Sequence, residues 1–322
     1  MDFHQIIGND KAIEALKKSI KNKTISHSYL FQGNEGIGKK KIAYAFSKAL
    51  LCKEEESEPC NKCTSCNKFN SGNNPDFFLI EPEKDLINVK KIEGLIDEMA
   101  TIPFESKRKV FIINDAHKMN QASQNKLLKT LEEPPAFAHM ILISSSPSSL
   151  LSTILSRVQR IKFYPIKTHK IIDLLVKEYN KTEEEARLIG ELTRGSIKKA
   201  IELSKDDAFW GKREEVIKII DSLIKGNRTR VFSSISFFDE NKEIIDEILD
   251  VFLFWFRDLI IYKELGQSNL LINKDKLECL GSQSHMDFCK INDIIENVLK
   301  TKENIKKNIN YQLAIETMLL SI

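Results

Sequence analysis

The feature that most constrains this chain is the glycine-rich segment GNEGIGKK at residues 33–40, which follows a short apolar stretch. It matches the pattern G-x-x-x-x-G-K-[ST] until its last position, where Lys40 replaces Ser or Thr. In such loops backbone N–H groups surround phosphates, the lysine neutralises charge, and the hydroxyl binds Mg²⁺. Because an ammonium group cannot bind a cation, the segment predicts an NTPase-like loop with damaged metal chemistry. Its expected phosphate-contacting residues are Gly33, Gly36, Gly38 and Lys39.

A second departure follows the apolar run 110–113. Asn114 and Asp115 stand where an active ATPase of this type has Asp and then Glu. Asn lacks the carboxylate that holds the metal, and Asp is a shorter general base than Glu. Together the two departures predict a chain that is built like an NTPase but does not hydrolyse ATP by itself. Weak nucleotide binding by the loop and Asp115 is left open.

Four of the six cysteines lie in one short segment with the spacing C-x₇-C-x₂-C-x₂-C, namely Cys52, Cys60, Cys63 and Cys66. Two overlapping C-x₂-C steps and a fourth nearby thiol can surround one Zn²⁺ tetrahedrally. Two disulfides or four unrelated thiols are the alternatives, and disulfides are rare in the intracellular setting expected here. The spacing predicts a structural zinc module at 52–66. Cys279 and Cys289 are expected to be ordinary thiols.

The length and the charge of the chain limit the number of domains and the kinds of partner that we expect. A chain of 322 residues is expected to form two or three domains. Its 49 Lys and Arg residues nearly balance its 46 Asp and Glu residues, so nucleic-acid contact requires a local patch. The N-terminus lacks a signal-peptide pattern, and the apolar run 251–256 is far too short to cross a bilayer. We therefore expect a cytoplasmic chain without membrane contact.

The first half of the chain predicts an α/β fold. Apolar strands alternate with amphipathic helices there, and the strands are expected at 29–31, 77–80, 110–113 and 140–143. Strands that are apolar throughout and separated by helices indicate a parallel sheet covered on both faces. This domain is expected to span residues 1–165.

The second half predicts helices. A capping box at 182–185 starts one of them, and no proline occurs from residue 206 onward. The aromatic-rich run 252–256 predicts a buried helix or an interface. We expect a small helical domain at 166–206 and a larger helical bundle at 207–322.

The chain resembles, over essentially its whole length, the delta-prime subunits of the bacterial DNA polymerase III clamp loader, which are members of the AAA+ superfamily. The run LLKTLEEPP at 127–135 is highly specific, and it occurs together with the cysteine insertion that precedes it in the chain. Other matching segments are residues 7–9, 27–31, 74–76, 107–110, 125–135, 153–157 and 255–259. The resemblance implies an AAA+ type parallel sheet with a zinc-binding insertion, then a helical lid and a helical collar that oligomerises.

This family also contains active motor subunits, gamma and its longer form tau. A motor requires a hydroxyl at position 40 and Asp-Glu at 114–115, which this chain lacks. The resemblance therefore implies a stator in a DNA-directed DNA polymerase holoenzyme, with an active gamma/tau-type motor as the alternative. Implied partners are the gamma/tau and delta subunits and, through the complex, the beta sliding clamp and primed DNA. Loading the clamp onto primed DNA during replication is the implied function.

The segment Ser156-Arg157-Val158 resembles the Ser-Arg-Cys motif of AAA+ proteins. The resemblance implies that Arg157 is an arginine finger, which stabilises charge on the ATP of a neighbouring motor subunit. Without the resemblance, Arg157 reads as a solvated loop charge. Residues 144–146, all Ser, end the fourth expected strand where AAA+ proteins place a phosphate-sensing polar residue, with an ordinary Ser-rich loop as the alternative. Lys198 stands in place of the Arg of the second sensor motif, and His117 is expected at the surface.

Overall fold

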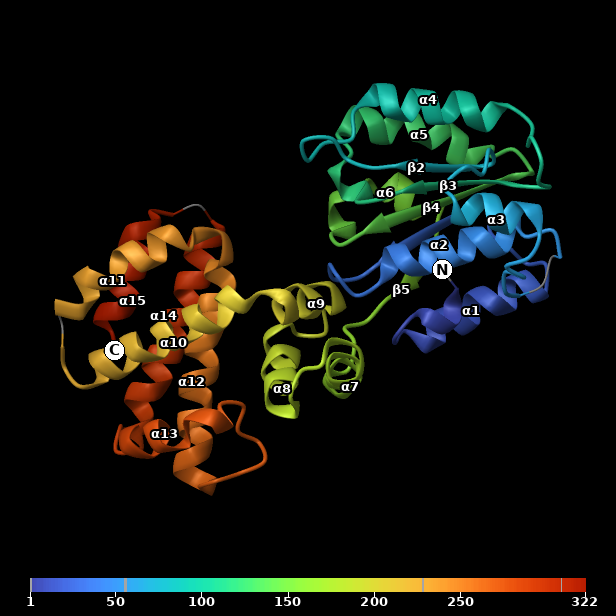
Figure 1. Cartoon of the computed structure of the whole chain (residues 1–322). Helices are drawn as coiled ribbons and strands as arrows, with labels where there is room; N and C mark the ends of the chain where they lie inside the picture. Colours follow the sequence, from blue (N-terminus) through green and yellow to red (C-terminus); the bar gives the residue numbers. More distant parts are fainter. Residues whose placement is uncertain (1, 55–56, 228, 308) are drawn as a thin grey trace. The chain divides into compact units, whose positions relative to one another are not determined.

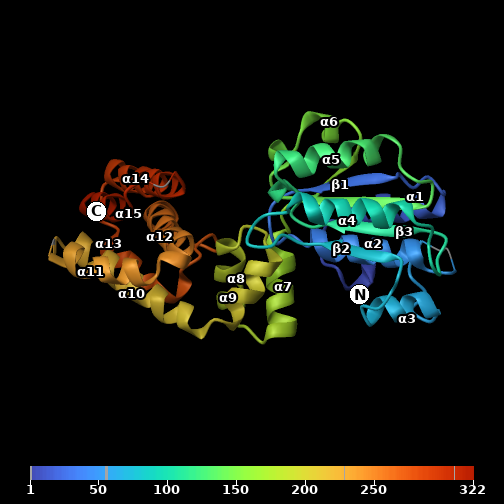
Figure 2. The same cartoon turned by 90° about the horizontal axis from the view of Figure 1, so that it is seen from above.

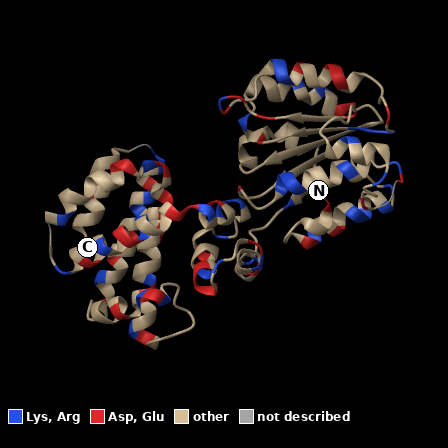
Figure 3. Ribbon diagram, viewed as in Figure 1, with Lys and Arg blue, Asp and Glu red and all other residues tan. Residues whose placement is uncertain are grey.

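The computed structural model describes residues 2–54, 57–227, 229–307 and 309–322. Its contacts divide the chain into two compact units, Met1–Lys170 with Gly195–Lys198, and Ile171–Arg194 with Lys199–Ile322 (Figure 1). Lys, Arg, Asp and Glu are interspersed on the helices of both units, whereas the strands are mostly free of them (Figure 3). The expected limits of three domains stay a prediction.

The first unit contains a five-stranded parallel sheet with the order β2-β3-β4-β1-β5. Its strands are β1 (Ser28–Gln32), β2 (Phe77–Ile80), β3 (Lys109–Ile113), β4 (Ala138–Ser144) and β5 (Gln159–Lys162). The expected parallel sheet with four apolar strands is confirmed. The edge strand β5 was not expected, because its sequence QRIK is polar and mostly exposed.

Helices cover both faces of this sheet (Figure 1). Neighbouring residues of a strand point to opposite faces, so Phe31 packs with one helix layer and Leu30 with the other. The first layer contains α1 (Asp10–Lys21) and α2 (Lys39–Leu51). The second contains α4 (Val89–Ala100), α5 (Gln121–Glu132) and α6 (Ser152–Leu155). The short helix α3 (Thr64–Asn70) begins within the cysteine segment and contains Cys66.

The second unit is helical. Figures 1 and 2 show α14 running beside α15 and α12, in agreement with their contacts. The capping box at Thr182 and Glu185 is present. The helices that follow β5 in the chain are α7 (Thr168–Tyr179), α8 (Glu183–Leu192), α9 (Ile197–Lys205), α10 (Asp207–Ile224), α11 (Thr229–Glu240), α12 (Ile245–Leu265), α13 (Leu277–Gln283), α14 (Phe288–Lys306) and α15 (Tyr311–Leu320). Single 3-10 turns lie at Phe3–Gln5, Ala116–Lys118, Pro147–Ser149, Lys242–Ile244 and Lys274–Lys276.

Helix α12 is the centre of the helical core. Phe252, Trp255 and Phe256 are fully buried, which confirms the expectation for the aromatic run. The indole N–H of Trp255 donates to Gln283 Oε1 at 2.9 Å. The buried carboxylate of Asp258 accepts the backbone N–H groups of Ile272 and Asn273 at 2.9 and 2.7 Å. The carboxylate of Asp258 thus helps to fix the loop at 272–273, whose Ile272 packs into the same core.

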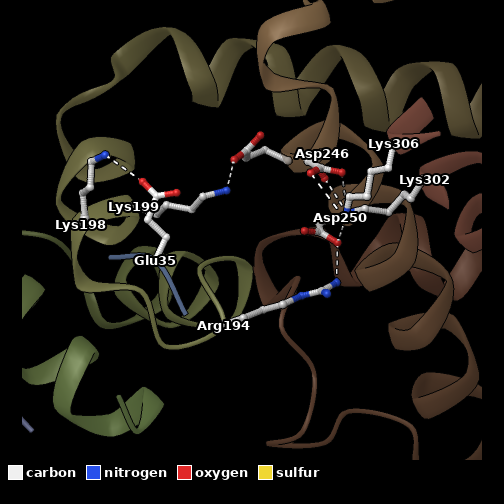
Figure 4. A network of polar contacts seen from close by, with 9 residues as sticks. Glu35, Arg194, Lys198, Lys199, Asp246, Asp250, Lys302 and Lys306 are labelled. Atoms are coloured by element: carbon white, nitrogen blue, oxygen red, sulfur yellow. Dashed lines mark hydrogen bonds and ion pairs between the residues drawn. The ribbon is translucent and has the colours of Figure 1, made fainter. Parts of the chain in front are cut away.

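A buried ion network joins other helices of the second unit (Figure 4). Asp250 of α12 contacts Lys302 Nζ of α14 at 2.7 Å and Arg194 Nη2, after α8, at 2.6 Å. Lys199 of α9 contacts Glu247 of α12 at 2.8 Å. Asp250 and Lys302 are both buried, so removing either one leaves a buried charge without its partner, which is destabilising. Arg194 and Lys199 approach this pair from the surface, since their side chains are more than half exposed. These pairs therefore fix α8 and α9 on the α12 bundle within this unit.

Candidate nucleotide and metal sites

The glycine-rich loop connects β1 to α2. Gly36 and Gly38 adopt φ values of 76° and 92°, in the region that favours glycine. The side chain of Lys39 is almost buried, and its ammonium donates to the carbonyl oxygens of Gly33 and Asn34. Burial lowers the pKa of Lys39, against the attraction of Asp115 and Glu35. The ammonium group of Lys39 is therefore hydrogen-bonded by backbone carbonyl oxygens of the loop itself.

The lysine that replaces the hydroxyl is also paired within the chain. Lys40 Nζ lies 2.7 Å from Glu81 Oε1, and Glu81 directly follows β2. Asn114 Nδ2 lies 3.5 Å from the same Glu81 oxygen and 3.3 Å from Asp115 Oδ2. The structure therefore brings both damaged motifs together around Glu81. Sequence reasoning missed Glu81, since a single acidic residue after a strand carries no motif.

The start of α9 packs directly against the loop, within the first unit. Lys198 N–H donates to Gly36 O at 3.1 Å, and the Lys198 side chain contacts Glu35 at 3.3 Å (Figure 4). A Cβ atom at Gly36 would lie only 2.0 Å from Ser196 Oγ. Gly36 is therefore required for packing, independently of any phosphate. Lys198, at the expected sensor position, neutralises a loop carboxylate.

Residues near the carboxyl end of β4 complete this site. Ser144 is buried at that end, and its Oγ accepts the N–H of Ser146 at 3.1 Å. Ser145 Oγ lies 3.4 Å from His117 Nε2. The expectation of a surface His117 is wrong: the residue is half-buried, and its Nδ1 has no hydrogen-bond partner among the described residues. Burial lowers the pKa of His117, against the attraction of Asp115.

Arg157 lies far from the loop in the sheet topology, because it precedes β5 whereas the loop follows β1. Because β1 and β5 are neighbouring parallel strands, these two positions lie at opposite ends of the strands. Its Nη2 contacts Glu132 Oε1 at 2.7 Å, and its Nη1 donates to Thr153 O at 3.0 Å. The side chain stays 36% exposed, so a neighbouring molecule can reach it. The adjacent Val158 packs into the core.

The four cysteine sulfurs of the predicted module meet in one cluster. All four Sγ atoms lie within 4.8 Å of one another, and those of Cys60 and Cys66 are 4.0 Å apart. Zn–S bonds of about 2.3 Å in a tetrahedron place sulfurs about 3.8 Å apart. The cluster thus has the donor atoms and spacing to hold a metal ion, as expected. Residues 55 and 56 of the predicted module lie outside the described residues.

The surroundings of the sulfurs fit thiolate ligands. Backbone N–H groups of Cys60, Cys63 and Cys66 point at the sulfur of the preceding cysteine at 3.3–3.4 Å. Burial raises the pKa of Cys63, but N–H donation from Lys53 and Cys66 outweighs it and lowers that pKa to about 6. Burial raises the pKa values of Cys52 and Cys66. A bound cation offsets that cost, because it deprotonates the thiols that bind it.

Comparison with known proteins identifies the family. The family model described as DNA polymerase III, delta subunit, matches residues 8–167. The model of the C-terminal part of that subunit matches residues 207–322. DNA polymerase III subunit delta' of Bacillus subtilis is 32% identical, over 97% of this chain and 95% of its own length. The chain belongs to the DNA polymerase III delta' family.

Other relatives of this delta' family member are more distant. DNA polymerase III subunit tau of Bacillus subtilis is 29% identical over 86% of the chain, which spans about half (53%) of that relative. A solved gamma subunit-related protein of Thermotoga maritima is 21% identical, with a TM-score of 0.43 and coverage of 96% of this chain and 97% of that one. Within the described part of the chain, every helix is too short or too polar to span a membrane.

Proposed function

We propose that this chain is the delta'-type stator of a cytoplasmic clamp loader, which places a sliding clamp on primed DNA. Its partners in this role are the gamma/tau and delta subunits. Membership of the delta' family, with matches at both ends of the chain, supports the assignment. The three-part division at residues 165 and 206 belongs to the same proposal, and helices begin at Thr168 and Asp207.

The observation that carries the stator role is the contact between Lys40 and Glu81. An internal ion pair stands at the position where an active loop holds Mg²⁺ through a hydroxyl. Asn114 offers an amide nitrogen to that same carboxylate, so it supplies no charge for a metal. The isolated chain is expected to show no ATP hydrolysis above background. Steady turnover that is lost in Lys39→Ala would instead identify a gamma/tau-type motor.

Arg157 acts in trans in this proposal, as an arginine finger for the neighbouring motor subunit. Its exposure and its tether to Glu132 support the assignment, because a held guanidinium needs little reordering to reach a phosphate. Loss of such a finger costs about 10³–10⁵ in rate at its own site. In a loader with several ATP sites the total loss is smaller.

The test uses the assembled complex. Arg157→Ala is expected to leave assembly intact while it lowers the ATPase and the rate of clamp loading. Arg157→Lys is expected to restore only part of the ATPase and clamp-loading rates. The compact ammonium group of lysine does not replace the planar, two-pronged guanidinium group of arginine. Arg160→Ala is the matched control, since Arg160 is an exposed neighbour bound to Leu155 O. Unchanged clamp loading by Arg157→Ala complexes rules out the finger.

The cysteine cluster holds a structural Zn²⁺ in this proposal. Its four-sulfur donor set is typical of closed zinc sites, which stabilise a fold and do not catalyse. The cluster is joined to α3, because the side chain of Cys63 caps the N-terminus of that helix. Zinc therefore orders the insertion between α2 and β2.

A further inference from the structure

The residues before α1 form a strap on the first unit. Phe3 is buried in its core, Ile6 packs against the same core, and Asn9 directly precedes α1. The polar side chains of this segment contact two other parts of the chain. One is the cysteine insertion at 52–66, and the other is the connection from β5 to α7. We call residues 2–9 the N-terminal strap.

A buried lysine joins the strap to the cysteine insertion. The side chain of Lys48, on α2, is only 1% exposed, and its ammonium group contacts Asp2 Oδ1 at 3.0 Å and also Asn61 Oδ1. Asn61 Nδ2 in turn donates to Asp2 Oδ2 at 2.8 Å. A buried charge is costly when it lacks partners. The strap and the insertion therefore stabilise the same ammonium group.

The position of Asn61 depends on the cysteines. It lies between Cys60 and Cys63 and has a φ of 60°, in the left-handed region that asparagine adopts more readily than most residues. The backbone N–H of Cys63 points at the Cys60 sulfur at 3.3 Å, which closes this turn against the cluster. The turn that aims Asn61 at Lys48 and Asp2 is therefore fixed when both sulfurs bind one metal ion.

The insertion makes a second contact with the strap. Glu58, which also belongs to the insertion, contacts His4 Nε2 of the strap and Lys17 Nζ of α1. Lys17 Nζ also lies 5.4 Å from the centre of the Phe3 ring, within the range of a cation–π contact. The insertion thus contacts the strap at Asp2 and at His4, the two neighbours of Phe3 in the chain.

The other end of the strap holds the connection from β5 to α7. Asn9 Nδ2 donates to Tyr164 O at 3.2 Å, and the Tyr164 N–H donates to Asn9 Oδ1 at 2.8 Å. A Cβ atom on Gly8 would lie 2.4 Å from Ile166 Cδ1, so the two backbones are packed closely. All of these contacts lie within the first unit. The strap therefore runs from the cysteine insertion to residues 163–167, which lead into α7.

We propose that the cysteine insertion, when it holds its metal, fixes the N-terminal strap and through it the connection from β5 to α7. The metal site thereby acts beyond the insertion, because it limits the motion of a segment through which the chain passes from the first unit into the second. This inference rests on the structural zinc of the proposed function. The competing explanation is that burial of Phe3 alone holds the strap, which is then independent of the metal.

The first test measures hydrogen exchange of the full chain, with zinc bound and after its removal by a chelator. The amides of Gln5 and Ile6 report on the strap, because they donate to Asp2 O and Phe3 O at 3.1 and 3.2 Å. Removal of zinc is expected to speed their exchange by about tenfold, the effect of losing one hydrogen bond to a charged group. The Tyr164 amide is expected to show a smaller increase.

Elemental analysis of the same samples separates two failures. Equal exchange at Gln5 and Ile6 before and after zinc removal overturns the inference and leaves the structural zinc intact, since Phe3 alone then holds the strap. A chain that is purified without zinc contradicts the structural zinc of the proposed function itself. The two failures are therefore distinguishable.

A side-chain variant tests the link between the insertion and the strap. Asn61→Gly keeps the left-handed turn and all four cysteines but removes the amide that contacts Lys48 and Asp2. It is expected to speed exchange at residues 5 and 6 while zinc stays bound. Asn180→Gly is the matched control, because Asn180 also has a positive φ, of 52°, but follows α7. An equal response of the two variants overturns the link.

The link at the other end of the strap is tested in the same way. Asn9→Gly keeps a left-handed backbone, with its φ of 56°, but removes the amide that is bound to Tyr164. Exchange of the Tyr164 amide is expected to rise about fivefold, the effect of one neutral hydrogen bond. Unchanged exchange of Tyr164 in this variant and in the metal-free chain overturns the proposed effect on the connection.

Thermodynamic linkage provides a readout in metal affinity. If bound zinc fixes the strap, the strap favours bound zinc by the same factor. Asp2→Asn removes the charge that faces Lys48 and leaves every cysteine in place. It is expected to weaken zinc affinity about fivefold in competition with a coloured chelator, whereas Asn180→Gly leaves it unchanged. Equal zinc affinity of the Asp2→Asn variant and the unmutated chain overturns the inference.

Discussion

The glycine-rich loop and the cysteine cluster both carry the sequence pattern of a ligand site, but they differ in what satisfies their polar groups. In the loop, Lys39 binds backbone carbonyls and Lys40 binds Glu81. In the cluster, the four sulfurs lie close together and accept hydrogen bonds from backbone N–H groups. The chain supplies internal partners for the loop, whereas the cluster has the donor arrangement of a site that is completed by a cation.

The difference shows that a chain can keep the pattern of a ligand-binding motif while a few neighbouring residues take the place of the ligand. Glu81 provides a negative charge for Lys40 from within the chain, at the position where an active loop holds Mg²⁺. The four thiols lie within 4.8 Å of one another, which is the donor arrangement of a metal site. We therefore expect the loop to tolerate the loss of ligands and the cysteine cluster to depend on its metal.

The largest expected effect is the loss of zinc. Cys66→Ser is expected to abolish binding of about one Zn²⁺ per chain and to destabilise residues around the cluster by more than about 4 kcal/mol, the range reached when a metal site is lost. Metal content by elemental analysis and local hydrogen exchange measure the two effects. Acid is expected to release the metal, because the thiols must be deprotonated to bind it.

Cys289→Ser is the matched control for this prediction. Cys289 is an exposed thiol on α14 and lies outside the cluster. It is expected to change neither metal content nor exchange. A Cys66→Ser chain that keeps its metal, or a metal-free wild-type chain with equal local stability, contradicts the dependence on zinc.

The next effect concerns packing of the loop itself. Gly36→Ala is expected to destabilise the first unit by about 2–4 kcal/mol, because it combines a left-handed backbone with a clash against Ser196 Oγ. Gly38→Ala isolates the backbone cost, since Gly38 also has positive φ but no atom within 4 Å of its Cβ position. Its expected cost is about 1–2 kcal/mol. Equal unfolding midpoints for both variants in urea would disprove the packing role.

The next prediction tests the same comparison by restoring the expected metal ligands to the glycine-rich loop. Lys40→Thr with Asn114→Asp returns a hydroxyl and a carboxylate to the loop. The pair is expected to increase nucleotide affinity about tenfold in the presence of Mg²⁺ and not in its absence. Titration of a fluorescent ATP analogue, with and without a chelator, measures this. An equal response of the unmutated chain to Mg²⁺ contradicts the idea that Lys40 and Asn114 removed the metal site.

The smallest expected effect is the contribution of the Lys40–Glu81 ion pair to the free energy of unfolding. Both side chains are close to half-exposed, at 44% and 48%, so water screens their attraction. A double-mutant cycle with Lys40→Ala and Glu81→Gln is expected to give a coupling of about 0.2–1 kcal/mol, weaker at high salt. Chemical unfolding measures it. The pair then balances charge at the loop without being a major source of stability.

Sequence patterns predicted the parts of the fold that rest on strong periodicity. The strands from Phe77 to Ile80 and around Phe111 are apolar throughout, because helices cover both sheet faces. The edge strand from Gln159 to Lys162 escaped prediction, since its polar residues face solvent and give no apolar signal. It forms because β1 offers it a row of backbone partners, which is a tertiary effect.

The candidate sites show the same limit. Cysteine spacing predicted the cluster because all four ligands are close in sequence. Glu81 and Glu132 could not be predicted, because each is brought to Lys40 or Arg157 by the fold. Their charges carry no pattern of their own. Spacing therefore predicts sites made of local ligands, and only packing reveals partners supplied by other elements.

The contact between Gly36 and Ser196 has a consequence for the history of such sequences. A glycine that packing requires is expected to resist replacement whether or not the loop binds a nucleotide. The hydroxyl at position 40 has no such protection, since a lysine paired with Glu81 fills its place at little cost. The positions of such a loop are therefore expected to change unevenly: a residue that serves both packing and ligand binding is replaced less readily than one that serves ligand binding alone.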